Sequence, residues 1–297
     1  MPTSQQHHNT FFLRSVAKML LRRFAPKSIK QALSKSALIS RQLSGDTYYD
    51  SQSGLHIPVH NEKEIRVFLD VSNTGGDKDP FIPHQLYKRS DEAYEVEDKL
   101  RKLVQRGVHG LVLPKFQFPR DARNLAAVSA IAPPDFFLLF SQEDPQPPQS
   151  GSMKEKSSCI LSFGDGNVQS KLESLVKDGM HSTLAICESD YMSDTEPITL
   201  ANNVATMIDK VGGCNFLLLS SKNDESADKA VDVCEELVYL DVAGPTIKSR
   251  LLIDSLNDDV LEDSMFAGVN KFVVDNESDI AVIEGVASSQ GKSVVKE

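Results

Sequence analysis

The sequence predicts an α/β fold of the (β/α)8 barrel type. Short apolar segments alternate with longer amphipathic segments along most of the 297 residues. The apolar segments are continuous runs, which is typical of strands covered on both faces of a parallel sheet. Eight of these runs occur beyond residue 60, and eight strands close such a barrel. We therefore expect residues 60–290 to form one barrel domain.

The predicted strands are Arg66–Val71, His109–Pro114, Asp135–Ser141, Ser158–Phe163, Thr183–Cys187, Asn215–Ser220, Arg250–Ser255 and Lys271–Asp275. Apolar residues recur with helical spacing between most of them. The predicted helices are Asp91–Arg106, Arg120–Ile131, Val168–Lys177, Ile198–Val211, Glu225–Val238, Asp258–Phe266 and Ile280–Ser288. Several end near a glycine, such as Gly107, which can adopt the left-handed conformation that terminates a helix. Helices that connect successive strands imply a parallel sheet.

Two segments depart from this alternation. Residues 142–157, after the third strand, contain three prolines and no helical period, so we expect a flexible insertion where a barrel normally has a helix. The C-terminal residues 291–297 are expected to fray. The alternative fold is an open, doubly wound parallel sheet. It is disfavoured because Gly75 and Gly76 stand alone after the first strand, without a Gly-x-Gly-x-x-Gly fingerprint.

A closed barrel makes a specific structural prediction. The first and last strands, Arg66–Val71 and Lys271–Asp275, should be hydrogen-bonded neighbours, whereas an open sheet would expose two edges. Val273 should be buried between the barrel and its helices.

The N-terminal residues 1–45 contain no Asp or Glu and eight Lys and Arg residues. Ser and Thr are frequent, and the apolar residues between Phe11 and Phe24 can share one helical face. This composition is typical of a mitochondrial or plastid transit peptide, and Arg41–Ser44 resembles the cleavage site of a matrix protease. We expect residues 1–44 to be disordered or removed in the mitochondrial matrix, with the plastid as the alternative. A basic arm for membrane surfaces or nucleic acid is the competing interpretation.

The remainder of the chain is acidic, because removing those eight residues leaves 24 basic against 42 acidic residues, a net charge near −18. Such a body would repel phosphate backbones, so nucleic acid is not expected as a partner. No stretch approaches the roughly 20 apolar residues of a membrane span, so no integral membrane segment is expected. The four cysteines form no Cys-x-x-Cys pair, which argues against a disulfide framework or a zinc site. The sequence does not indicate an oligomeric state.

In parallel α/β folds, ligands bind at the carboxyl ends of the strands. Polar residues follow each predicted strand: Asp70, Ser72, Asn73, Lys115, Ser141, Glu143, Asp165, Glu188, Asp190, Lys222, Asp254 and Asp275. Carboxylates predominate, which suits Mg²⁺ holding an oxygen-rich substrate. Each of these residues can also be an ordinary solvated loop residue or a helix cap.

Lys115 and Lys222 are the candidate catalytic lysines, with Asp70 as a catalytic carboxylate and with Ser72 and Asn73 as substrate-binding residues. A partly desolvated lysine at a barrel mouth can have a pKa low enough for Schiff-base chemistry with a carbonyl. Alternatively, it binds a carboxylate or phosphate as a point charge. Lys222 can also be an exposed charge at a helix start.

The segment from Ile65-Arg66-Val67 through Leu113-Pro114-Lys115 resembles the HpcH/HpaI aldolase and citrate-lyase-β family. That family has an Arg-bearing strand, then a helix, then a strand ending in Leu-Pro-Lys. The resemblance, over residues 65–165, implies that Arg66 binds substrate. It also implies that Glu143 and Asp165, the latter after Phe163-Gly164, bind Mg²⁺.

The leading functional hypothesis is therefore a Mg²⁺-assisted carbon–carbon lyase or aldolase acting on a small organic acid or its acyl-CoA thioester. The alternative is a catalytically inactive barrel that acts as a scaffold or assembly subunit in an organelle. Carboxylates that converge beside Lys115 would favour the enzyme, and carboxylates that scatter would favour the scaffold.

Overall fold

The structure is a computed structural model. It describes residues 47–50, 55–58, 64–72, 81–83, 86–88, 90–114, 122–141, 151–192, 195–221, 224–240, 245–249, 258–266 and 268–296. All of them belong to the compact unit formed by residues 43–297.

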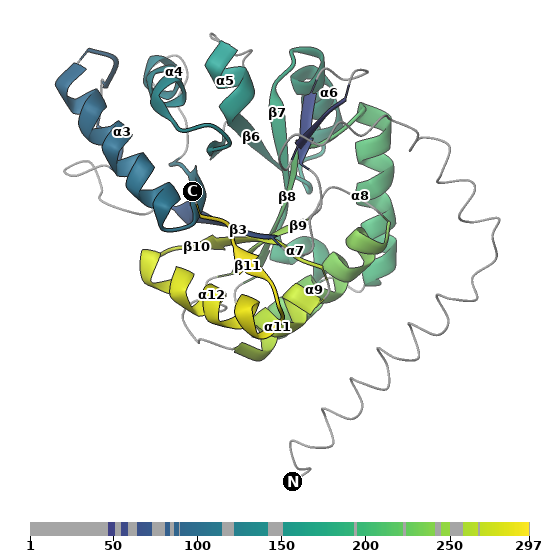
Figure 1. Ribbon diagram of the computed structural model, residues 1–297. Helices are drawn as coiled ribbons and strands as arrows, with labels where there is room; N and C mark the ends of the chain where they lie inside the picture. The colour runs from purple at the N-terminus through teal and green to yellow at the C-terminus, as the bar shows by residue number, and fades with distance from the viewer. Residues whose placement is uncertain are drawn as a thin grey trace. The chain divides into compact units, whose positions relative to one another are not determined.

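Eight parallel strands form a closed ring in this unit (Figure 1). In order, they are β3 (Glu64–Asp70), β4 (Val108–Val112), β5 (Phe137–Ser141), β6 (Ser157–Ser162), β7 (His181–Ile186), β8 (Phe216–Ser221), β9 (Pro245–Ser249) and β10 (Lys271–Val274). Each strand pairs with the next in the chain, and β10 returns to pair with β3, with Lys271 opposite Arg66. The predicted (β/α)8 barrel and its closure are therefore confirmed, and the open-sheet alternative is wrong.

Helices connect the strands and lie outside the ring (Figure 1). They are α3 (Ser90–Gln105), α4 (Ala122–Ile131), α5 (Gly151–Lys156), α6 (Val168–Lys177), α7 (Glu188–Tyr191), α8 (Pro197–Val211), α9 (Asp224–Tyr239), α11 (Asp258–Phe266) and α12 (Ile280–Ser289). The short 3₁₀ helices η2 (Leu86–Lys88) and η3 (Glu277–Asp279) precede α3 and α12, and β1 (Thr47–Asp50) pairs antiparallel with β2 (Leu55–Pro58). Within the described part of the chain, no helix combines the length and apolar character needed to cross a membrane.

Two apolar cores account for the folding of this barrel. The larger lies between strands and helices and takes alternate strand residues such as Val67, Leu69 and Leu138. The smaller, here called the inner cluster, fills the barrel interior with Phe68, Val112, Leu139, Ala185, Phe216, Leu218 and Val273. Both faces of the strands are thus apolar, which explains their continuous apolar sequences. Val273 belongs to the inner cluster, so its expected position between barrel and helices is wrong.

The seventh strand is not the one predicted. The position between β8 and β10 is taken by β9, with Pro245 opposite Leu217 and Ser249 opposite Ser221. The predicted strand Arg250–Ser255 lies outside the described residues. Its apolar run was the stronger local signal, but strand identity depends on the partners on either side, which sequence periodicity does not include.

The connection between β5 and β6 contains a helix that the sequence did not predict. Residues 151–156 form α5, and Ser157 already begins β6. Met153 is buried against the outer core, and the side chains of Lys156 and Ser157 donate to backbone carbonyls of Ala132 and Met153. The hydrogen bond from Lys156 to Ala132 and the packing of Met153 are nonlocal, and they stabilise a segment without helical periodicity. Residues 142–150 lie outside the described residues, so the flexibility of the insertion stays a prediction.

The C-terminal tail is paired, so the expectation that it frays is wrong. Strand β11 (Ser293–Val294) runs parallel to the start of β3, and the Val295 amide donates to the Ile65 carbonyl at 3.0 Å. Gly107, at the end of α3, makes room for this tail. A Cβ atom there would lie 2.7 Å from Cγ1 of Val294, and its φ of 94° also favours glycine.

Candidate functional site

Asp70 is the predicted site residue that the structure places most clearly at the carboxyl-terminal mouth of the barrel. It ends β3 two residues after Phe68 of the inner cluster, so it faces the barrel interior. Its side chain is buried, and Oδ1 accepts the backbone N–H of Ser72 at 2.8 Å. The apolar inner cluster lies beneath it and forms the floor of the mouth.

Other polar residues occupy the same end of neighbouring strands. Ser141, Ser162 and Ser220 each follow an inward-facing residue by two positions, and Asp275 does so after Val273. Cys187 follows β7, and its Sγ lies 3.9 Å from Oγ of Ser162. The mouth therefore combines a buried carboxylate with hydroxyl groups and a partly exposed thiol above an apolar floor.

The acidic residues after β6 and β7 are engaged locally. Asp165 Oδ2 lies 2.7 Å from Nζ of Lys171, and its Oδ1 accepts the Asn167 N–H at 2.9 Å. The hydrogen bond from Lys171, followed by that from Asn167, lowers the pKa of the Asp165 carboxyl. Asp190 Oδ2 accepts the Cys187 N–H at 2.8 Å, at the start of α7. Asp165 therefore forms a local turn before α6, and Asp190 forms a local contact at the start of α7.

The expected Mg²⁺ site falls only partly within the described residues. Both oxygens of Asp165 already accept hydrogen bonds from Lys171 and Asn167, and the second expected ligand, Glu143, lies outside the described residues. Among the side chains that the structure describes, no group of three or more His, Cys, Asp and Glu residues could hold a metal ion. The metal assignment thus gains no geometric support from this part of the chain.

Several further predicted site residues cannot be placed. Lys115, Lys222, Asn73 and Asp254 lie outside the described residues. Val112, opposite Asp70 in the β3–β4 ladder, precedes Lys115 by three residues. Lys115 therefore follows the strand next to Asp70 in the ring.

Arg66 lies at the opposite end of β3. It precedes Asp70 by four residues on the same face of the strand, which separates the two backbones by about 13 Å. Their backbones therefore lie toward opposite ends of the barrel interior, and substrate binding by Arg66 stays a prediction.

Sequence reasoning missed two residues inside the ring, Lys271 and His109, and it missed the strand that contains Lys248. Lys271 begins β10 and is only 3% exposed, and its register partner is Arg66. His109 is the extra residue of a β-bulge in β4, where Val67 pairs with Val108 and Phe68 with Gly110. Lys248 in β9 pairs with Val273 and Ser220, at the mouth end of the ladder. A buried lysine within an apolar run, as in Lys271-Phe272-Val273-Val274, was the available signal.

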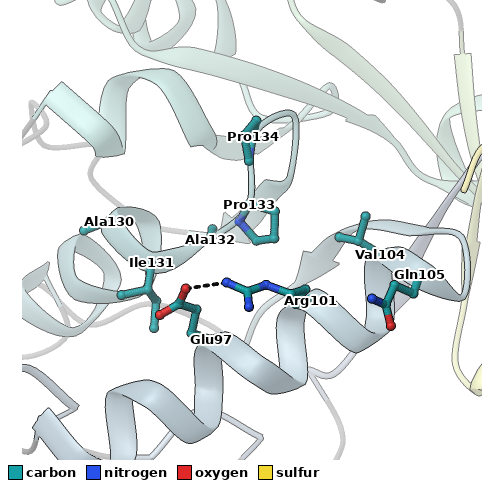
Figure 2. Close-up of a pocket in the computed structure, with 9 residues that line it drawn as sticks. All are labelled: Glu97, Arg101, Val104, Gln105, Ala130, Ile131, Ala132, Pro133 and Pro134. Atoms are coloured by element: carbon teal, nitrogen blue, oxygen red, sulfur yellow. Dashed lines mark hydrogen bonds and ion pairs between the residues drawn. The ribbon is translucent and has the colours of Figure 1, made fainter. Parts of the chain in front are cut away.

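A cavity of about 510 Å³ lies on the helical layer, outside the barrel mouth (Figure 2). The carboxyl-terminal half of α3 forms one wall, with Glu97 and Arg101 in an ion pair at 2.8 Å. Residues 130–134, at the end of α4 and in the turn after it, form the other wall. Its lining contains the Glu97–Arg101 ion pair and Gln105 among apolar residues, so it presents no unpaired charge.

Comparison with known proteins supports the fold. No protein-family model matches the chain, and no curated protein matches it in sequence. Dihydropteroate synthase from Vibrio fischeri is 11% identical, with a TM-score of 0.54 over 84% of this chain and 99% of that one. 3-Dehydroquinate dehydratase from Geobacillus kaustophilus is 9% identical, with a TM-score of 0.51 over 81% of this chain and 96% of that one.

These solved structures are TIM-barrel enzymes, and at such low identity the similarity concerns the fold alone. None of the comparisons gives sequence evidence for the HpcH/HpaI family, so that resemblance stays a hypothesis.

Proposed function

We propose that this barrel is an aldolase-like carbon–carbon lyase that acts on a small organic acid with a carbonyl group, or on its thioester, at the carboxyl-terminal mouth. The observation that carries the proposal is the position of Asp70. Its carboxyl group is 2% exposed, faces the barrel interior and stands above an apolar floor. Burying a carboxyl group is unfavourable, and buried ionisable groups in clefts are concentrated at catalytic sites.

Lys115 supplies the amine in this proposal because it follows β4, the strand paired with Asp70. The lysine attacks the substrate carbonyl, and loss of water gives a protonated imine. Asp70 accepts the proton of the substrate hydroxyl as the carbon–carbon bond breaks. The bonding electron pair moves into the imine and forms an enamine. Reprotonation and hydrolysis then release the second product and the free lysine. Lys222, which follows β8, is the second candidate amine. No step is assigned to Mg²⁺.

The proposal is tested by trapping the imine. The full chain is incubated with a panel of small 2-oxo acids, pyruvate among them, then reduced with borohydride and analysed by intact mass. We expect a single covalent adduct in the wild type that is absent in Lys115→Met. Lys102→Met is the matched control because Lys102 is exposed on α3 and pairs with Asp98. A wild type that gives no adduct with any member of the panel contradicts the proposal.

The competing function is a catalytically inactive scaffold. It is favoured by the local engagement of Asp165 and Asp190, which removes two carboxylates from the expected ring. Failure of the trapping experiment, together with a stable complex on size-exclusion chromatography of native extracts, would support it.

Residues 1–44 are proposed to direct the protein to an organelle, the mitochondrial matrix in the first instance. N-terminal sequencing of the native protein is the direct test. A mature chain that begins near residue 45 supports cleavage, whereas a chain that begins at Met1 or Pro2 contradicts it.

A further inference from the structure

The connection after β3 is folded back onto the helical layer of the barrel. It begins beside Asp70, whose Oδ1 accepts the Ser72 N–H, and it continues through η2 into α3. The described later part of this connection consists of residues 81–83 and 86–88. Leu86, in η2, is 2% exposed and belongs to the larger core between strands and helices. This part of the connection is therefore anchored in the core, although it belongs to no strand.

The side-chain amide of Asn124 binds this connection at two backbone positions. Its Oδ1 accepts the Leu86 N–H at 2.8 Å, and its Nδ2 donates to the Pro83 carbonyl at 3.0 Å. This pair of hydrogen bonds is here called the Asn124 clamp. Asn124 lies 38 residues beyond Leu86 in the chain, so the clamp forms only when the chain is folded. One amide group thus satisfies a backbone donor and a backbone acceptor of the same segment.

Further contacts hold the same segment against α3. Phe81 and Ile82 are partly buried and pack against the larger core. Nζ of Lys99, on α3, lies 4.3 Å from the centre of the Phe81 ring, which is within the range of a cation–π interaction. The segment therefore contacts α3 through Phe81 and α4 through the Asn124 clamp.

Asn124 lies on the same side of the barrel as the mouth. It is the third residue of α4, and the helices of a (β/α)8 barrel begin on the side where the preceding strands end. The connection that leads from β4 into α4 contains Lys115. Asn124 therefore joins the connection after β3, which begins beside Asp70, to the helix that ends the connection after β4.

We infer that Asn124 is a positioning residue of the mouth, because its clamp fixes the connection after β3 relative to the connection after β4. The inference rests on the proposed function, in which Asp70 and Lys115 act on one substrate from these two parts of the chain. Groups on different loops react efficiently only when their separation is held, and a displacement of about 1 Å can lower a rate about a hundredfold. Asn124 acts through the backbone of Pro83 and Leu86.

The first measurement needs no substrate. Hydrogen–deuterium exchange at the Leu86 amide of the full chain reports the clamp directly, because this N–H donates to Asn124. Asn124→Ala should speed that exchange about tenfold, the equivalent of one net hydrogen bond, while amides of the barrel strands keep their protection. Asn124→Asp keeps an accepting oxygen and should recover most of the protection. Asn202→Ala is the matched control, because the Asn202 amide donates to the Ile198 carbonyl within α8.

The second measurement is borohydride trapping with pyruvate over a range of concentrations. Asn124→Ala should lower the maximal trapping rate about tenfold and change the half-saturating concentration less than about twofold, because positioning rather than binding is lost. Asn124→Asp should recover most of the rate, and Asn202→Ala should match the wild type. A wild type without any adduct contradicts the proposed function, and the exchange at Leu86 then decides whether Asn124 holds the connection. The inference is overturned if Asn124→Ala keeps either the wild-type protection at Leu86 or the wild-type maximal rate.

Discussion

The two ends of the barrel interior differ in charge although they are built from the same strands. On β3, Arg66 lies at the amino-terminal end and Asp70 at the carboxyl-terminal end, on one face and four residues apart. Lys271 and Asp275 repeat this arrangement at the ends of β10. Aromatic rings of Phe68, Phe137 and Phe216 separate the ends.

This difference shows how one strand can place groups of opposite charge at the two ends of a barrel interior. The backbones of Arg66 and Asp70 lie about 13 Å apart, with the aromatic rings of the barrel interior between them. The cost of placing a charged group in the barrel interior must therefore be offset separately at each end, through solvent, a ligand or a shifted pKa. The carboxyl-terminal end does so beside hydroxyl groups and solvent, and the amino-terminal end has Lys271 and His109 with lowered pKa values.

The separation depends on the inner cluster, so its disruption should have the largest effect. Val273→Asp places a carboxylate among the apolar side chains between the two ends and should lower the free energy of unfolding by several kcal/mol. Urea denaturation gives the measurement. Ile198→Asp is the control because Ile198 is 52% exposed on α8, and it should change stability little. Equal effects of the two variants would show that Val273 is not buried in the barrel.

The amino-terminal end should contribute a characteristic pH dependence in phosphate-free buffer. The pKa of Lys271 is about 7 in the folded protein, below its ordinary value of 10.5, so the unfolded chain binds more protons between these pH values. Stability must then rise with pH across this window, by up to about 1.4 kcal/mol per pH unit.

Lys271→Met should remove that rise and should be more stable than the wild type at pH 6, when the buried ammonium carries its full cost. Urea denaturation of both proteins at pH 6, 7.5 and 9 gives the difference directly, because other titrating groups cancel. A constant difference between the two proteins would mean that Lys271 does not titrate in this range.

The tail closes the amino-terminal end beside β3, and Gly107 tests that packing. Gly107→Ala should cost about 1–3 kcal/mol, because the new methyl group needs both a left-handed backbone and the space of Val294. Gly291→Ala is the matched control: its φ is also positive, at 70°, but nothing lies within 4 Å of its Cβ position. Thermal unfolding should rank Gly107→Ala as the less stable variant. The reverse order would argue against the paired tail.

The smallest effect is expected at the carboxyl-terminal rim. Asp165→Asn weakens a local hydrogen bond with Lys171 between two partly exposed side chains, so the melting temperature should change only slightly. Added Mg²⁺ should shift the melting temperatures of the wild type and the variant equally. A Mg²⁺-dependent stabilisation of the wild type that disappears in Asp165→Asn would restore the metal assignment.

The sequence by itself determined the barrel. Continuous apolar runs arise because each strand packs against helices on one face and against the inner cluster on the other. This pattern lies within each strand segment, so it can be recognised in the sequence. Two helices, Val168–Lys177 and Asp258–Phe266, have the bounds that periodicity predicts. The position of Asp70 near a strand end could also be predicted from the sequence, because a strand ends where its apolar run stops.

Tertiary structure alone decided what depends on partners distant in the chain. Strand β9 is defined by the ladders with β8 and β10, and the tail becomes a strand because β3 offers it hydrogen bonds. The same is true of the charges. Whether Lys271 is a surface charge or a buried cation depends on the strand register that places it opposite Arg66. Whether Asp165 is a metal ligand or a partner of Lys171 depends on the fold of its loop. Local periodicity contains neither fact, because each arises from the register of segments brought together by folding.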